Sequence, residues 1–105
     1  MDIYRGDNFK FNVTAKKDGE LFIFYPGDSL KVGIKNKLTN TNCELLKKIL
    51  ITERTDTVAV DFSHEETKKV CQGTKVLEVE LTDSDGNVST LYQGKINVKG
   101  DVINE

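Results

Sequence analysis

Two runs of alternating apolar and polar residues constrain the fold of this chain most strongly. The first run spans residues 75–82, the second spans 88–98, and Asp83-Ser84-Asp85-Gly86-Asn87 separates them. A period of two places the apolar side chains on one face of an extended strand. An Asp-Gly step between two such runs favours a β-hairpin, because glycine accepts the positive φ that hairpin turns need. The segment therefore predicts a hairpin of two antiparallel strands.

Earlier parts of the chain predict further short strands. Apolar and aromatic residues mark them at 9–13, 21–25, 30–34 and 58–62. Turns are expected between them at Lys16-Lys17-Asp18-Gly19 and at Pro26-Gly27-Asp28, where proline followed by glycine suits type II geometry. Residues 39–42 are polar and predict a loop. Short strands that follow one another through tight turns are typical of an all-β domain.

Two segments raise the question of helix. Residues 44–54 place leucines and isoleucines at helical spacing, yet Ile49, Ile51 and the following residues suit a strand, and strand is preferred because of its neighbours. Ser63 and Glu66 have the spacing of a capping box, which predicts one short helix within residues 63–70 that stops near Gly73.

The whole chain, residues 1–105, fits one domain. About seven strands and one short helix predict an antiparallel β-sandwich, with a small closed barrel as the alternative. The net charge of −2 predicts no nucleic-acid partner. No secretory signal or membrane span is evident, so we expect synthesis in the cytoplasm and no membrane partner. Cys43 and Cys71 are therefore expected to be buried thiols rather than a disulfide.

Three segments resemble catalytic or binding motifs, but the residues around each of them argue against that function. His64 lies in a polar helix start, where exposure is expected. The turn at 83–87 lacks the spacing of an EF-hand calcium loop, which needs glycine at position six and glutamate at position twelve. Arg5-Gly6-Asp7 spells an adhesive tripeptide, but the preferred interpretation is a bend into the strand that follows, with the Asp7 side chain binding a nearby amide.

Five carboxylates are candidates for acid–base work, but none of them lies in an apolar context that would raise its pKa. They are Asp61, Glu65, Glu66, Asp83 and Asp85. No phosphate-binding glycine loop is present either. We therefore expect a protein that is not an enzyme and holds no cofactor or metal.

Several phrases in the chain resemble a family of small immunoglobulin-like proteins of tailed bacteriophages and prophages. This family is related to the N-terminal domain of siphophage upper baseplate proteins. The phrases are Arg5-Gly6-Asp7-Asn8-Phe9, Thr57-Val58-Ala59-Val60 before the Ser63-led helix, Asp83-Ser84-Asp85-Gly86-Asn87-Val88-Ser89-Thr90-Leu91, Gly94-Lys95-Ile96-Asn97-Val98 and Asp101-Val102. Their order and spacing match along nearly the whole chain.

The resemblance implies an immunoglobulin-like sandwich that serves in a virion, commonly in the tail or baseplate. Such a protein docks on other virion proteins or on copies of itself, is made in the bacterial cytoplasm and then becomes part of the virion. Two departures are visible. The chain stops at Glu105 without the long extension of larger relatives, and Gly73 is kept without the proline and aromatic residue that relatives place nearby.

Five residues are expected to line contacts with a partner. They are Phe22, Phe24, Tyr25, Leu91 and Tyr92, with Leu91 facing away from Tyr92 along its strand. The competing interpretation is that the aromatic residues simply fill the core. The alternative function is a carbohydrate- or ligand-binding sandwich, against which the absence of tryptophan counts.

Overall fold

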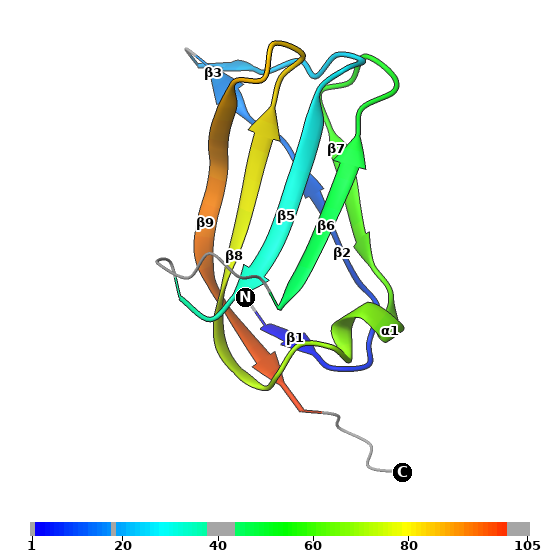
Figure 1. The fold of residues 1–105 in the computed structure, drawn as a ribbon, viewed down its shortest axis with the longest axis vertical. Coiled ribbons are helices and arrows are strands. Elements are labelled where there is room, and N and C mark those ends of the chain that lie inside the picture. Colours follow the sequence, from blue (N-terminus) through cyan, green and yellow to red (C-terminus); the bar gives the residue numbers. More distant parts are fainter. Residues whose placement is uncertain (1, 18, 38–43, 101–105) are drawn as a thin grey trace.

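The structure is a computed structural model that describes residues 2–17, 19–37 and 44–100 (Figure 1). Its largest element is a five-stranded sheet, whose strand order is β1 (Asp2–Tyr4), β9 (Val88–Lys99), β8 (Gly73–Thr82), β5 (Ser29–Lys35) and β6 (Leu45–Leu50). Strands β2 (Phe9–Val13) and β7 (Val58–Phe62) form a second sheet, and β3 (Lys16–Lys17) pairs with β4 (Glu20–Leu21). The one described helix is α1 (His64–Thr67), which follows β7.

The two main sheets pack face to face, with β2 and β7 behind the five-stranded sheet in the view of Figure 1. Alternate residues of each strand meet in the space between them. The core includes Val13, Val32, Val60, Phe62, Leu77 and Ile96. The predicted all-β sandwich is therefore confirmed.

Strand order follows the immunoglobulin plan. Strand β2 pairs with β7 in one sheet. Strands β5, β8 and β9 form the centre of the other sheet, and β6 is added at its edge. One pairing departs from the expected antiparallel scheme, because β1 runs parallel to β9 with Ile3 beside Val98. The chain has no tryptophan, so packing of aliphatic and phenylalanine side chains fills the centre instead of the tryptophan that antibody domains place there.

The ambiguous segment after residue 44 is a strand. Leu45 is buried, Ile49 packs against the core, and β6 pairs antiparallel with β5 along its whole length. The strand ends at Leu50, short of the predicted Arg54, because Ile51 turns into the core and donates its backbone N–H to Asp28. Pairing with β5 outweighs the helical spacing of the leucines.

The aromatic segment at 21–25 is not the strand that was predicted. Strand β4 ends at Leu21, and Phe24 makes only a single bridge with Thr55. Phe22 and Phe24 instead turn inward and contact each other edge to face, with 5.3 Å between ring centroids. The following turn is as predicted, because Gly27 has φ +101° and Asp28 donates its N–H to Tyr25 at 3.0 Å.

Helix α1 begins with the predicted capping box. The Ser63 hydroxyl accepts from the Glu66 N–H, and the Glu66 carboxylate accepts from the Ser63 N–H. The helix caps at Lys68, earlier than expected, because Val70 then enters the core, and Gly73 starts β8 rather than ending the helix. The loop predicted at 39–42 lies outside the described residues. No helix among the described residues is long and apolar enough to span a membrane.

Candidate protein-contact surfaces

The β8–β9 hairpin contains one irregularity that changes the predicted contact surface. Its loop is as expected, with Gly86 at φ +89° and the Gly86 N–H donating to the Asp83 carbonyl. Further along, Glu80 pairs with Thr90 and Val79 pairs with Tyr92, so Leu91 is an extra residue in β9. Such a β-bulge bends the strand and reverses the alternation of side chains. The prediction that Leu91 faces away from Tyr92 is therefore wrong.

Leu91 and Tyr92 instead line one pocket at the side of the sandwich where β9 passes β2. The pocket has a volume of about 240 Å³ and is lined by Phe11, Asn12, Val13, Thr14, Leu77, Val79, Leu91 and Tyr92. Leu91 is half-buried against the core, whereas Tyr92 is 44% exposed. The Tyr92 ring lies over Gly94, and a Cβ at Gly94 would come within 2.7 Å of the ring carbon Cζ. Gly94 thus leaves the space that this ring occupies.

The other three predicted contact residues have different environments. Phe24 is fully buried, so the expectation of an exposed contact there is wrong, because the chain turns Phe24 into the core. Phe22 is half-buried beside it. Tyr25 is 52% exposed and lies under the guanidinium of Arg54, 6.0 Å from the ring centroid. A role for Phe22, Tyr25, Leu91 and Tyr92 in binding a partner stays a prediction.

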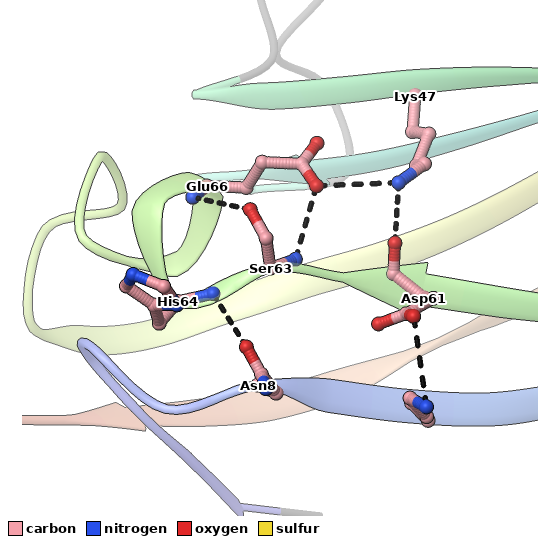
Figure 2. Close-up of polar contacts among 7 residues, drawn as sticks. Asn8, Lys47, Asp61, Ser63, His64 and Glu66 are labelled. Carbon is pink, nitrogen blue, oxygen red and sulfur yellow. Dashed lines mark hydrogen bonds and ion pairs between the residues drawn. The ribbon is translucent and has the colours of Figure 1, made fainter.

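The sheet formed by β2 and β7 has two edges that are unpaired among the described residues, since these strands pair only with each other. The edge of β7 is closed by Lys47 of β6 (Figure 2). The Lys47 ammonium group donates to the backbone carbonyl of Asp61, pairs with Glu66 at 3.2 Å and lies 5.6 Å from the centroid of the Phe62 ring. A charged group directed at an open strand edge discourages pairing with another chain.

The same region shows how α1 is held against the sheets (Figure 2). Asn8, just before β2, accepts a hydrogen bond from the His64 N–H at 2.8 Å through its side-chain oxygen. The hydrogen bond from the Ser63 N–H and the ammonium of Lys47 lower the pKa of Glu66. His64 itself is exposed, as expected for the start of this helix. The cluster thus serves to fix α1 between β2 and β6.

The tripeptide Arg5-Gly6-Asp7 is also part of this attachment. Gly6 has φ +87°, and the Asp7 N–H donates to Tyr4, which makes the expected bend. The hydroxyl of the fully buried Thr67 accepts from the Gly6 N–H at 3.0 Å and donates to the Asp7 carbonyl at 2.8 Å. The predicted contact of the Asp7 side chain is replaced by contacts of its backbone. The tripeptide is therefore tied to α1.

In the loop at residues 83–87, backbone N–H groups of the loop itself bind the Asp83 carboxylate. The Asp83 carboxylate accepts from the N–H groups of Asp85 and Asn87 at 2.9 Å each, and the hydrogen bond from Asn87 contributes most to the lowered pKa of Asp83. This is a turn that saturates its acidic group with backbone donors. No group of three or more histidine, cysteine, aspartate or glutamate residues suited to a metal ion occurs in the described part of the chain.

Cys71 is exposed, which contradicts the expectation of a buried thiol, and Cys43 lies outside the described residues. The reason is its place on the surface connection between α1 and β8. Its backbone N–H donates to the Glu44 carboxylate at 2.8 Å, and Glu44 pairs with the buried ammonium of Lys75, also at 2.8 Å. Cys71 thus contributes its backbone, rather than its sulfur, to this end of the sandwich.

The outward side of the five-stranded sheet, here called the outer face, is turned toward the viewer in Figure 1, and β2 and β7 lie behind the sheet. Its residues are Leu46, Lys48 and Leu50 on β6, Ser29, Lys31, Gly33 and Lys35 on β5, Val76, Glu78, Glu80 and Thr82 on β8, and Val88, Thr90, Gln93 and Lys95 on β9. Lys35 and Val76, which pair with each other at one end of this face, are buried. Three of these are large apolar residues left exposed: Leu46 at 52%, Leu50 at 69% and Val88 at 60%.

Two acidic residues lie side by side at the centre of the outer face. Glu78 pairs with Lys35 at 3.1 Å and accepts from the Gln93 amide at 2.5 Å. Burial raises the pKa of Glu78, but the hydrogen bonds from Gln93 and Glu80 outweigh it, so the pKa lies below the usual value. The shared hydrogen bond with Glu78 raises the pKa of Glu80. The sequence did not lead us to predict this pair, although residues two apart on a strand share a face.

Comparison with known proteins identified no protein-family model, no curated protein and no solved structure that matches this chain.

Proposed function

We propose that this chain is a non-catalytic structural protein of a tailed bacteriophage or prophage. It acts in the tail or baseplate of the virion, through contacts with other virion proteins or with copies of itself. The phrases quoted from the sequence support the phage assignment by resemblance. The single observation that carries the docking role is the set of three exposed apolar side chains on the outer face.

The physical basis is the apolar area that the outer face leaves in water. A sheet with one face in solvent normally alternates buried apolar residues with polar residues outside. Here Leu46 and Leu50 point outward from the edge strand β6, and Val88 points outward from β9. Burying a leucine side chain stabilises a complex by about 2 kcal/mol relative to leaving it exposed. Such side chains at both margins of one face favour association with a protein surface.

Purified particles test the proposal. The strain that encodes the chain is induced, its particles are purified by density gradient, and the chain is sought by mass spectrometry and by antibody labelling in electron microscopy. We expect labelling at the tail or its tip, together with neighbouring genes for tail, portal or holin proteins. Particles that lack the chain in every fraction would refute the virion role.

A matched pair of variants tests the surface. Leu50→Asp alters the outer face, where the leucine is 69% exposed, whereas Leu21→Asp alters a leucine on β4 that is 48% exposed and lies away from this face. In a strain whose own gene is deleted, we expect the Leu21 variant to enter particles and the Leu50 variant to be lost from them. Binding of the purified chain to a defined glycan on an array, with normal particles in the deletion strain, would favour the carbohydrate-binding alternative instead.

A further inference from the structure

The register of the sheet arranges the outer face in rows that cross four strands. Each row contains one residue from each of β6, β5, β8 and β9, in that order across the sheet. The rows are Leu50, Ser29, Thr82, Val88; then Lys48, Lys31, Glu80, Thr90; then Leu46, Gly33, Glu78, Gln93. Exposed apolar residues therefore occupy both margins, whereas the centre is basic on β5 and acidic on β8. Across the line between β5 and β8 the central charge therefore changes sign, from basic to acidic. The margins on the two sides of this line both carry apolar residues.

We propose that the outer face binds a second copy of this chain, face to face, about a two-fold axis that lies between β5 and β8 and runs parallel to the strands. This proposal deepens the proposed function and rests on it, since it names the partner of the docking surface. A closed two-fold dimer uses the same surface on both subunits, and that surface must be complementary to itself.

The rows meet this requirement. Rotation about the stated axis places β6 of one copy over β9 of the other, and β5 over β8. Leu50 then faces Val88 of the second copy, and Lys31 faces Glu80 of the second copy. Each of these contacts occurs twice. Within one chain no ion pair joins Lys31 to any other described residue, so its ammonium group is available.

The charges also argue against the other face-to-face arrangement. A two-fold axis in the face but across the strands would place β5 over β5 and β6 over β6. Lys31 and Lys48 would then lie over the same basic strands of the second copy, and like charges opposed across an interface cost several kcal/mol. The lysines on these two strands therefore favour the axis that runs along the strands.

The size of the face sets the expected strength. Four strands about 4.8 Å apart, and the length of β5 at about 3.3 Å per residue, give a plane of about 400 Å². Stable interfaces bury about 800 Å² on each partner. We therefore expect a weak dimer, with a dissociation constant on the order of 100 µM, which repeated contacts in an assembly would strengthen. Higher salt should weaken it, because its central pair is ionic.

Charge exchange provides the test. Lys31→Glu gives a chain that is acidic at both central positions, and Glu80→Lys gives one that is basic at both. Association is measured by sedimentation equilibrium from about 10 µM to about 1 mM, a range that spans the expected dissociation constant. Each variant alone should associate at least about tenfold more weakly than the parent, whereas an equimolar mixture should associate about as well as the parent.

The mixture separates contacts between chains from those within one. Lys31 and Glu80 are also neighbours within one chain, so each variant loses the same internal attraction whether alone or mixed. Only a contact between copies can recover in the mixture. Circular dichroism of each variant confirms that it folds, and Leu50→Ser against Leu21→Ser provides a second pair in which only the first should weaken association.

Two results would overturn the proposal. One is a parent chain that remains a monomer at 1 mM, about tenfold above the expected dissociation constant. The other is a mixture that associates no better than its components. Either result, obtained for a chain that is nevertheless found in particles, would leave the virion role standing with a different partner. Absence from particles would remove that role, whatever the oligomeric state.

Discussion

Thr67 provides the sharpest test of how the fold is held together, because one buried hydroxyl connects the N-terminal turn to α1. The side chain is fully buried, and its Oγ1 atom accepts from the Gly6 N–H at 3.0 Å and donates to the Asp7 carbonyl at 2.8 Å. Thr67→Val keeps the shape of the side chain and removes both of these hydrogen bonds, together with the longer one that the hydroxyl donates to the His64 carbonyl at 3.2 Å. The change therefore isolates the hydroxyl from the packing.

The magnitude follows from the groups left without a partner. A buried polar group that loses its hydrogen bond costs about 1–3 kcal/mol. Two such groups would cost up to about 6 kcal/mol, but Gly6 is only half-buried and Asp7 is exposed, so water reaches part of the bend. We expect Thr67→Val to lower the free energy of unfolding by about 2 kcal/mol. Thr67→Ser keeps the hydroxyl and loses one methyl group, for about 1 kcal/mol.

Urea unfolding, followed by circular dichroism at pH 7, measures both changes. Amide hydrogen exchange adds a local readout, since the Gly6 N–H should lose protection in Thr67→Val and keep it in Thr67→Ser. A valine variant destabilised by less than about 0.5 kcal/mol, or a serine variant less stable than the valine variant, would show that the Thr67 hydroxyl does not hold the N-terminal turn.

Three further predictions concern the bulge, the hairpin loop and the edge of β7. Gly94→Ala should displace the Tyr92 ring and destabilise the fold by about 1–2 kcal/mol in urea unfolding. In a Tyr92→Ala background the same substitution should be neutral or stabilising. Equal effects in both backgrounds would contradict the contact between Gly94 and the Tyr92 ring. Since the pKa of Asp83 is lowered in the folded chain, its carboxylate contributes stability above the unfolded pKa of 3.8 that is lost as the pH falls through the lower folded value. Asp83→Asn should therefore be less stable than the parent at pH 7, with the difference shrinking by pH 2, and a difference that stays constant with pH would count against this. Lys47→Met keeps the packing on Phe62 but removes the charge at the edge of β7, so turbidity during mild heating should rise more than for Lys16→Met; equal turbidity would show that Lys47 does not protect this edge.

The sequence predicts the regular parts of this fold well, because local patterns determine them. Period-two alternation identifies β2, β5, β7 and the hairpin, and the spacing of Ser63 and Glu66 identifies the start of α1. The aromatic run at 21–25 misleads for a physical reason. Phe22 and Phe24 have high strand propensity, yet the core takes up both rings and leaves the backbone with only one bridge.

The candidate surfaces were harder to foresee. The face of β9 from which the Leu91 side chain projects depends on which residue of β9 is left unpaired. The register between β9 and β8 determines that residue, and the identity of residue 91 does not. Leu46 and Leu50 belong to the segment whose pattern allowed helix or strand, so their exposure could not be assigned before the pairing with β5 was known. The pair Glu78 and Glu80 was visible in the alternation and was overlooked.

The extra residue in β9 has a practical consequence for anyone who attaches a probe to this strand. Beyond Tyr92 the odd positions Gln93 and Lys95 point to solvent on the outer face, whereas before Leu91 the even positions Val88 and Thr90 do so. A cysteine scan that follows a single parity along β9 would therefore switch sides halfway and label two surfaces. Choosing positions on either side of residue 91 by opposite parity keeps every label on one side of the protein.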